Sequence, residues 1–228
     1  MSTAGKNTAP SKGRRRASLL SAAAVGELYG ALAERIDPKP ELNFTNRFEL
    51  LIAVVLSAQA TDRSVNAVTA ELFRRCTTPG DYLELGLETL EEATRSIGLY
   101  RNKSRSIIGL CQALIQRHNG EVPGTEEELT ALPGVGIKTA NVVLNLGFGK
   151  PVIAVDTHIF RVANRTGLVS EKTPEATGKA LTAITPAEYL LNAHHYLLLH
   201  GRYTCTARNP KCGECPLAEH LCMHRKKQ

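Results

Sequence analysis

The sequence has no long apolar segment. Its longest uninterrupted apolar run, Leu50 to Leu56, has seven residues, whereas a transmembrane helix needs about 20. Residues 1–20 lack the apolar stretch and the small-residue cleavage site of a secretory signal. We therefore expect no membrane span and a cytoplasmic protein.

Signals for β-strands are also scarce. From Ser21 to Leu199 apolar residues recur at helical spacing, as in Leu28, Leu32 and Ile36, and few segments alternate apolar with polar residues. Gly and Pro residues divide this region into segments of ordinary helix length. With 228 residues and 43% hydrophobic content, the chain can form a sizeable core. The pattern predicts an all-α fold.

Positive charge is concentrated at the two ends of the chain. Of the net charge of +6, residues 1–20 carry +5 and residues 201–228 carry +4, which leaves −3 for the chain between them. The N-terminal segment, rich in Arg, Ser, Thr, Pro and Gly, cannot bury enough apolar surface to fold, so we expect residues 1–20 to be a disordered basic tail. Attraction to nucleic-acid phosphates and a purely solubilising role both stay open for it.

Four of the six cysteines lie within the last 24 residues, separated by six, two and six residues: Cys205, Cys212, Cys215 and Cys222. In a chain without a secretory signal, such a group favours a metal site over disulfides. Structural zinc usually takes two close pairs of ligands, so a single close pair suits a 4Fe-4S cluster better. On spacing alone, zinc stays an alternative. Cys76 and Cys111 lie in helical stretches and are expected in the core.

A helix-hairpin-helix is predicted over about residues 125–146. Thr125 and Glu128 precede apolar positions, which is typical of a capped helix start, and this helix should end near Leu132. A Gly-rich turn follows, and a second helix begins near Ile137. An ordinary connection between helices is the alternative interpretation.

The predicted turn contains Gly134, Val135 and Gly136. The two glycines let the backbone approach a phosphate closely, and the free N–H groups at the start of the second helix form an anion site. Such a hairpin binds the DNA backbone without reading sequence. We therefore expect these three residues to contact DNA.

Two titratable residues stand at predicted helix starts. The helix dipole disfavours a positive charge on Lys138, which favours a neutral, nucleophilic amine; a phosphate-binding or solvated lysine is the alternative. Asp156 follows an apolar run and stands at the predicted start of another helix. Asp156 can cap that helix and also stabilise developing positive charge and relay protons.

Several stretches together resemble the endonuclease III family: residues 132–140, which read LPGVGIKTA, residues 155–158, which read VDTH, and the four C-terminal cysteines. Further matching stretches are residues 56–62, 97–100 and 200–203, so the resemblance extends from about Phe48 to Cys222. One departure is the last gap between cysteines, which is usually five residues in the family and six here.

The resemblance implies two helical domains with a DNA-binding cleft between them. A six-helix barrel with the hairpin would span roughly residues 41–150, and residues 21–40 with 151–228 would form a second domain around the 4Fe-4S cluster. The protein would act as a monomer on damaged double-stranded DNA.

The resemblance also implies a bifunctional DNA glycosylase/AP lyase that excises oxidised pyrimidines such as thymine glycol. The damaged nucleotide is flipped out of the helix, Lys138 attacks its sugar to form a Schiff base, and β-elimination nicks the strand. Asp156 would be the catalytic acid. Gln59 would fill the gap that the flipped nucleotide leaves, and Leu99 would be a wedge pressed into the base stack.

Three alternatives stay open at this point. They are a glycosylase or AP lyase of the same fold with another lesion preference, a non-catalytic DNA-binding protein with a structural metal, and an iron-sulfur electron carrier.

Two expectations concern single side chains. Asp62 should cap a helix that begins at Arg63. Three histidines should be packed or hydrogen-bonded rather than metal-bound: His194, His195 and His200.

Overall fold

The computed structural model describes residues 20–224, and within that range it contains helices and no strand. The all-α prediction is confirmed. The basic tail predicted for residues 1–20 lies, except for Leu20, outside the described residues. The helices are α1 (Ala22–Ala33), α2 (Arg47–Ser57), α3 (Asp62–Arg75), α4 (Pro79–Leu85), α5 (Leu87–Ala93), α6 (Tyr100–His118), α7 (Glu126–Thr130), α8 (Ile137–Phe148), α9 (Thr157–Thr166), α10 (Pro174–Ile184), α11 (Ala187–Leu190) and α12 (Ala193–Tyr203).

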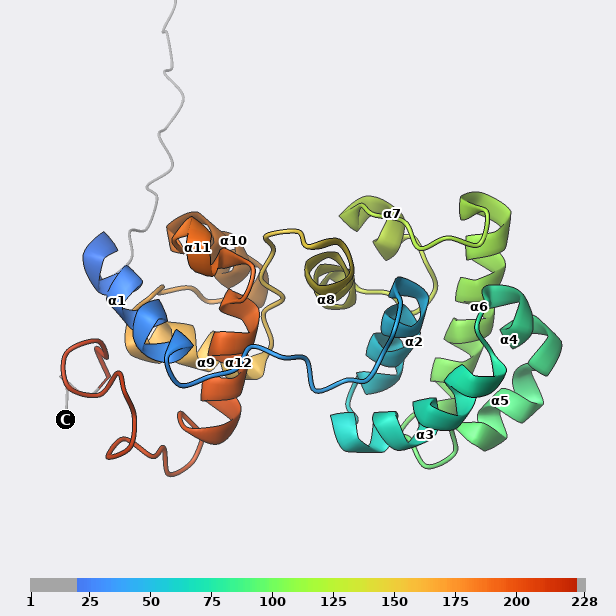
Figure 1. Cartoon of the computed structure of the whole chain (residues 1–228), viewed down its shortest axis with the longest axis horizontal. Coiled ribbons are helices and arrows are strands. Elements are labelled where there is room, and N and C mark those ends of the chain that lie inside the picture. Colours follow the sequence, from blue (N-terminus) through green and yellow to red (C-terminus); the bar gives the residue numbers. More distant parts are fainter. Residues whose placement is uncertain (1–19, 225–228) are drawn as a thin grey trace, which may run out of the picture.

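The helices form two halves, each with its own hydrophobic core (Figure 1). Helices α2 to α8 form one half, which we call the barrel half, and α1 with α9 to α12 forms the other, the cysteine half. The chain passes between them twice, over residues 34–46 and 149–156. Two helical domains are therefore confirmed, and the residue limits given above stay a prediction.

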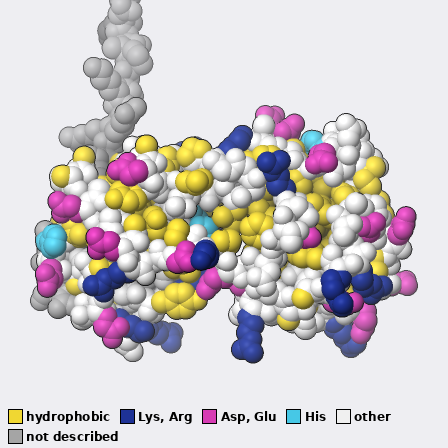
Figure 2. Space-filling model, in the orientation of Figure 1, with side chains coloured by type: hydrophobic (Ala, Val, Ile, Leu, Met, Phe, Trp, Pro, Cys, Tyr) yellow, Lys and Arg dark blue, Asp and Glu magenta, His cyan; other side chains and the backbone are white. Residues whose placement is uncertain are grey.

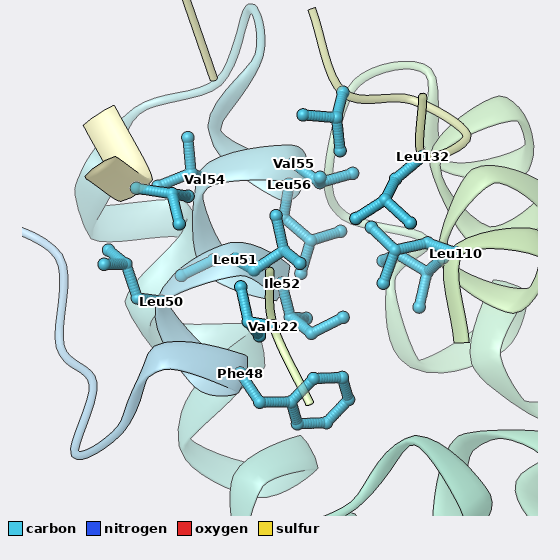
Figure 3. Packing of buried hydrophobic residues seen from close by; sticks show 14 of the residues in the cluster. Phe48, Leu50, Leu51, Ile52, Val54, Val55, Leu56, Leu110, Val122 and Leu132 are labelled. Carbon is cyan, nitrogen blue, oxygen red and sulfur yellow. The ribbon is translucent and has the colours of Figure 1, made fainter. Parts of the chain in front are cut away.

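Helix α2 is the centre of the barrel half. Its residues from Phe48 to Leu56 are all buried, and it packs against α8, α3 and α6. Figure 3 shows its side chains beside Leu110, Val122 and Leu132. A helix that is apolar on all sides belongs inside a core, which accounts for the apolar run in the sequence. None of the described helices has both the length and the apolar character that crossing a membrane requires.

The cysteine half is built around the close packing of α12 on α9 and on α1. Leu28 and Leu32 of α1, Val162 of α9 and Leu197 of α12 are fully buried in its core. Gly201 permits the close approach of α12 to α9, because a Cβ atom there would lie 2.9 Å from the Cβ of His158. This packing fixes the start of α9, where Asp156 lies, relative to α12.

Candidate active site

The predicted helix-hairpin-helix is present as α7, a tight turn and α8. Thr125 caps α7 by accepting a hydrogen bond from the Glu128 N–H at 3.2 Å, and its hydroxyl donates to the Glu128 carboxylate at 2.6 Å. Helix α7 ends at Thr130, two residues before the expected position. The N–H of Val135 closes the turn on the carbonyl oxygen of Leu132 at 3.2 Å.

The two glycines of the turn meet different surroundings. Gly134 has a φ of +77°, and a Cβ atom there would lie 2.6 Å from the Cβ of Ser106 on α6. Gly136 has nothing within 4 Å of such an atom. Val135 lies between them with its side chain buried in the core. Gly134 is therefore required by the fold, whereas Gly136 leaves open space at the surface.

Helix α8 begins directly after this turn, with Gly136 at its cap position and no side chain bonded to its first turn. Gly136, Ile137 and Lys138 are all exposed. The uncapped N–H groups and the positive end of the helix dipole consequently face solvent, which suits an anionic ligand. Lys138 lies in this first turn.

Asp156 ends the second connection between the halves and caps α9. Its carboxylate accepts a hydrogen bond from the Ile159 N–H at 2.8 Å. Ile153 and Ala154, just before it, are buried, so the start of α9 is held in place from both sides. The carboxylate is partly exposed.

One cleft between the halves contains Lys138 and Asp156 together. The barrel half contributes Gln59, Asp62 and Lys138 to its walls, and the cysteine half contributes Asp156, His194 and Arg202. Figure 2 shows a histidine side chain at the waist between the halves, with acidic and basic side chains beside it. An amine, a carboxylate and an uncapped helix start are thus gathered where the two halves meet.

The expectation for Asp62 is wrong. Helix α3 begins at Asp62 itself, and the side chain of Thr61 caps it by accepting from the Ser64 N–H. The Asp62 carboxylate instead accepts a hydrogen bond from Arg202 at 2.6 Å. Partial burial raises its pKa, and the nearby charge of Lys138 acts in the opposite direction.

Gln59 and Leu99 share an unusual backbone conformation in neighbouring loops. Their φ angles are +55° and +60°, in the left-handed region that non-glycine residues rarely adopt. A Cβ atom on Gly98 would lie 3.8 Å from the Gln59 carbonyl oxygen, so the two loops are in contact. Gln59 lines the cleft, and the Leu99 side chain is 57% exposed. The structure presents both side chains at the surface at some cost in backbone strain.

Lys103 joins α6 to the end of α2, beside these two loops, and the sequence patterns did not single it out. Its side chain is buried, and its ammonium group donates to the carbonyl oxygen of Leu56, at the end of α2, at 2.9 Å. Its backbone N–H donates a hydrogen bond to the carbonyl oxygen of Leu99 at 3.1 Å. The signal was present in the sequence, because Lys103 shares one helical face with Ile107 and Leu110.

The histidines are buried as expected. His194 packs edge-on against His195, with ring centroids 5.0 Å apart, and both line the cleft. Burial, with smaller contributions from His195 and Lys138, lowers the pKa of His194 to about 3. His194 is therefore neutral at physiological pH, and its Nδ1 has no hydrogen-bond partner.

The four C-terminal cysteines line one small pocket with apolar walls: Cys205, Cys212, Cys215 and Cys222. Burial raises the pKa of the Cys215 thiol, a hydrogen bond with the Leu217 backbone opposes this, and the nearby sulfur atoms of the other three cysteines add to it. Among residues 20–224, no group of three or more His, Cys, Asp or Glu side chains is arranged to hold a metal ion. The four cysteines of the pocket nevertheless supply the thiolate ligands that iron-sulfur clusters use.

The longer gap between the last two cysteines is absorbed without loss of packing. Leu217, Ala218 and Leu221 are buried beneath it, while Glu219 and His220 between them are exposed. The extra length is therefore accommodated at the surface. Cys76 and Cys111, the other two cysteines, are buried in the barrel core.

Two family models match the chain. Residues 52–187 match the HhH-GPD superfamily base excision DNA repair protein, and residues 205–222 match the iron-sulfur binding domain of endonuclease III. The second match begins at Cys205 and ends at Cys222, so the cofactor of this chain is a 4Fe-4S cluster.

Similar proteins of known identity agree with these matches. Endonuclease III of Escherichia coli (strain K12) is 55% identical over 190 residues, covering 83% of this chain and 90% of the relative. Endonuclease III of Treponema pallidum (strain Nichols) is 52% identical over 205 residues, covering 90% and 97%. A solved structure of a trapped endonuclease III–DNA covalent intermediate is 48% identical with a TM-score of 0.85, covering 92% of this chain and 99% of the other. The chain therefore belongs to the endonuclease III family and is a DNA glycosylase/AP lyase of base excision repair.

Proposed function

We propose that this enzyme excises oxidised pyrimidines of the thymine glycol type from duplex DNA and then nicks the strand through a Schiff base on Lys138. The observation that carries the proposal is the placement of Lys138 and Asp156, from different halves of the molecule, in one cleft. The similar structure of a trapped DNA covalent intermediate supports covalent chemistry of this kind. We further infer that the enzyme acts as a monomer on DNA in the cytoplasm.

The proposed reaction begins when the damaged nucleotide leaves the base stack and enters the cleft. The neutral amine of Lys138 attacks C1′, the glycosidic bond breaks, and the base leaves with the bonding electrons. Asp156 stabilises the positive charge that develops on the sugar and relays protons. The attached nitrogen then loses a proton and the C1′–O4′ bond opens with a proton going to O4′, which leaves a protonated Schiff base between C1′ and Lys138. Proton loss from C2′ then breaks the bond from C3′ to its phosphate oxygen, so that the 3′ phosphate leaves and the strand is nicked.

DNA binding in this proposal uses the hairpin and the two strained loops. The turn formed by Gly134, Val135 and Gly136 approaches a backbone phosphate, and the uncapped N–H groups at the start of α8 bind that phosphate. Gln59 enters the gap that the flipped nucleotide leaves, and the exposed Leu99 presses into the neighbouring stack. Both are presented beside the cleft that receives the nucleotide.

The four cysteines that line the apolar pocket are the proposed ligands of the 4Fe-4S cluster: Cys205, Cys212, Cys215 and Cys222. When bound, the cluster would cross-link the C-terminal segment by joining its four cysteines. That segment already packs on the cysteine-half core through Leu217 and Leu221. We assign the cluster a scaffold role for the wall that carries Asp156.

Borohydride trapping tests the covalent mechanism. Duplexes with one thymine glycol or one abasic site are incubated with the enzyme and reduced, and the protein–DNA adduct is measured. The unmodified enzyme should form the adduct on both duplexes and Lys138→Gln on neither. Lys172→Gln, which changes an exposed lysine outside the cleft, is the control. An adduct with Lys138→Gln would contradict the assignment of Lys138 as the nucleophile. If the unmodified enzyme formed the adduct on abasic-site DNA but not on thymine glycol DNA, the proposed lesion class would be wrong.

A further inference from the structure

Arg202 on α12 connects the two halves across the cleft. Its Nη1 donates a hydrogen bond to the Asp62 carboxylate on α3 at 2.6 Å and also contacts the Glu41 carboxylate. The neighbouring Tyr203 hydroxyl donates to the other Glu41 oxygen. We call Glu41, Asp62, Arg202 and Tyr203 the Arg202 cluster.

Of the two acceptors of the Arg202 cluster, one belongs to the barrel half and the other is fixed to it. Asp62 begins α3. Glu41 lies in the first connecting segment, but Asn66 of α3 fixes that segment, since its side chain donates to the Glu41 carbonyl oxygen at 2.8 Å and accepts from the Asn43 N–H at 2.9 Å. Arg202 and Tyr203 therefore bind one rigid patch of the opposite half.

The extensive packing between described helices lies either inside the barrel half or inside the cysteine half, and none of it joins the two. At the far end of α8, the Asn145 side chain donates to the Leu191 carbonyl oxygen at 3.0 Å. The hydrogen bonds between the halves thus lie at two places, the Asn145 contact and the Arg202 cluster.

We propose that the Arg202 cluster positions the two cleft walls, so that Lys138 on one wall and Asp156 on the other act on the same sugar. Arg202 and Asp62 line that cleft. Their side chains are only 29% and 18% exposed, and salt screens such pairs less than it screens exposed ones. The planar guanidinium can hold two carboxylates at once. The inference rests on the proposed function, because it takes Lys138 and Asp156 as the reacting groups.

A distance measurement without DNA tests the positioning role directly. Spin labels are attached to p-acetylphenylalanine at Gln112 of α6 and Ala183 of α10, both exposed and in different halves. Electron–electron resonance then gives the distance distribution. Arg202→Met should broaden it, and Arg202→Lys, which keeps a point charge, should broaden it less. Arg95→Met, which removes an exposed pair within the barrel half, is the matched control and should leave it unchanged.

The same variants should separate rate from binding. With Arg202→Met we expect the single-turnover excision rate to fall about tenfold, because small misplacements of reacting groups are costly. Duplex affinity should change less than about threefold. Arg202→Lys should recover part of the rate.

An unchanged distance distribution in Arg202→Met overturns the proposal. If excision falls in that case, Arg202 contacts the substrate instead. Should Arg202→Met not fold, Glu41→Gln removes one of the two carboxylates, and the same broadening is required of it. The distance readout involves no catalysis, so its failure is distinguishable from a failed Lys138 trapping experiment.

Discussion

Asp156 combines a structural and a chemical task in one carboxylate, and the two tasks can be separated. Asparagine keeps an oxygen that can accept the Ile159 N–H, so Asp156→Asn should preserve the start of α9. It removes the negative charge proposed to stabilise the transition state. We expect single-turnover excision to fall by about 100-fold or more and duplex affinity to change less than about threefold.

Thr173→Ala is the control for this prediction, because it deletes the side-chain cap of α10 in the same half. It should cost about 1 kcal/mol of stability and leave the excision rate unchanged. If Asp156→Asn instead behaved like Thr173→Ala, Asp156 would be only a helix cap.

His194 makes the stability of the enzyme depend on pH. Its pKa is lowered to about 3 in the folded state, whereas an exposed histidine titrates near 6.5. The unfolded chain therefore takes up a proton below pH 6.5 that the folded chain does not. Between pH 6.5 and pH 5, His194 should reduce the free energy of unfolding by about 2 kcal/mol.

Denaturant unfolding at pH 7.5 and pH 5 tests this expectation. His194→Phe keeps a ring in the core and should lose less stability on acidification than the unmodified enzyme. Equal losses in the two proteins would contradict the role of His194.

Residue types and local spacing predicted the helix starts well. They failed where a partner that is distant in the sequence determines the role of a side chain. Thr125 and Asp156 cap helices as the sequence indicates. Asp62 was wrongly assigned a cap, because Thr61 takes that place and Asp62 pairs with Arg202, 140 residues away. Nothing in the local sequence reports so distant a pair.

At the scale of elements, the two glycines of the hairpin turn have different roles. We expect Gly134 to be needed for folding and Gly136 for DNA binding. Gly134→Ala places a methyl group 2.6 Å from Ser106 at a positive φ, which should destabilise the fold by about 2 to 4 kcal/mol. Gly136→Ala has open space and should change stability by less than about 1 kcal/mol. It should nevertheless weaken duplex binding, because its methyl group lies where we expect a phosphate.

Thermal unfolding and duplex titration of both variants test this contrast. Equal destabilisation by the two substitutions would contradict the structural assignment of Gly134. Full affinity in Gly136→Ala would contradict the phosphate contact at the start of α8.

The loops of Gln59 and Leu99 mark the limit of sequence-based prediction at this scale. The family resemblance predicts that both residues contact DNA, but their left-handed φ angles follow from no local pattern. These conformations accompany the buried bond from Lys103 to the Leu56 carbonyl oxygen, which ties α6 to the end of α2. Such strain depends on tertiary contacts.

Across the whole molecule, loss of the iron-sulfur cluster should affect one half only. Cys205, Cys215 and Cys222 pack against the core formed by α1, α9 and α12, and none of the four C-terminal cysteines belongs to the barrel core. Cys222→Ser should reduce the visible absorption band of the cluster. It should also increase hydrogen exchange in α1, α9 and α12, while α2 stays protected.

Cys111→Ala is the control, since it changes a buried cysteine of the barrel half. It should keep the absorption band. Stoichiometric zinc with no visible band in the unmodified protein would contradict the cluster, and increased exchange spread equally over both halves would contradict a local scaffold role.

The barrel half is inserted between α1 and the rest of the cysteine half, and this order affects how the chain is made. A ribosome releases all of α2 to α8 before α9 appears, so the barrel half can fold while synthesis continues. Helix α1 emerges before the other described helices, but it packs against α12, which begins about 160 residues after α1 ends. The apolar residues Leu28 and Leu32 of α1 therefore lack the surroundings that bury them until α12 has been synthesised.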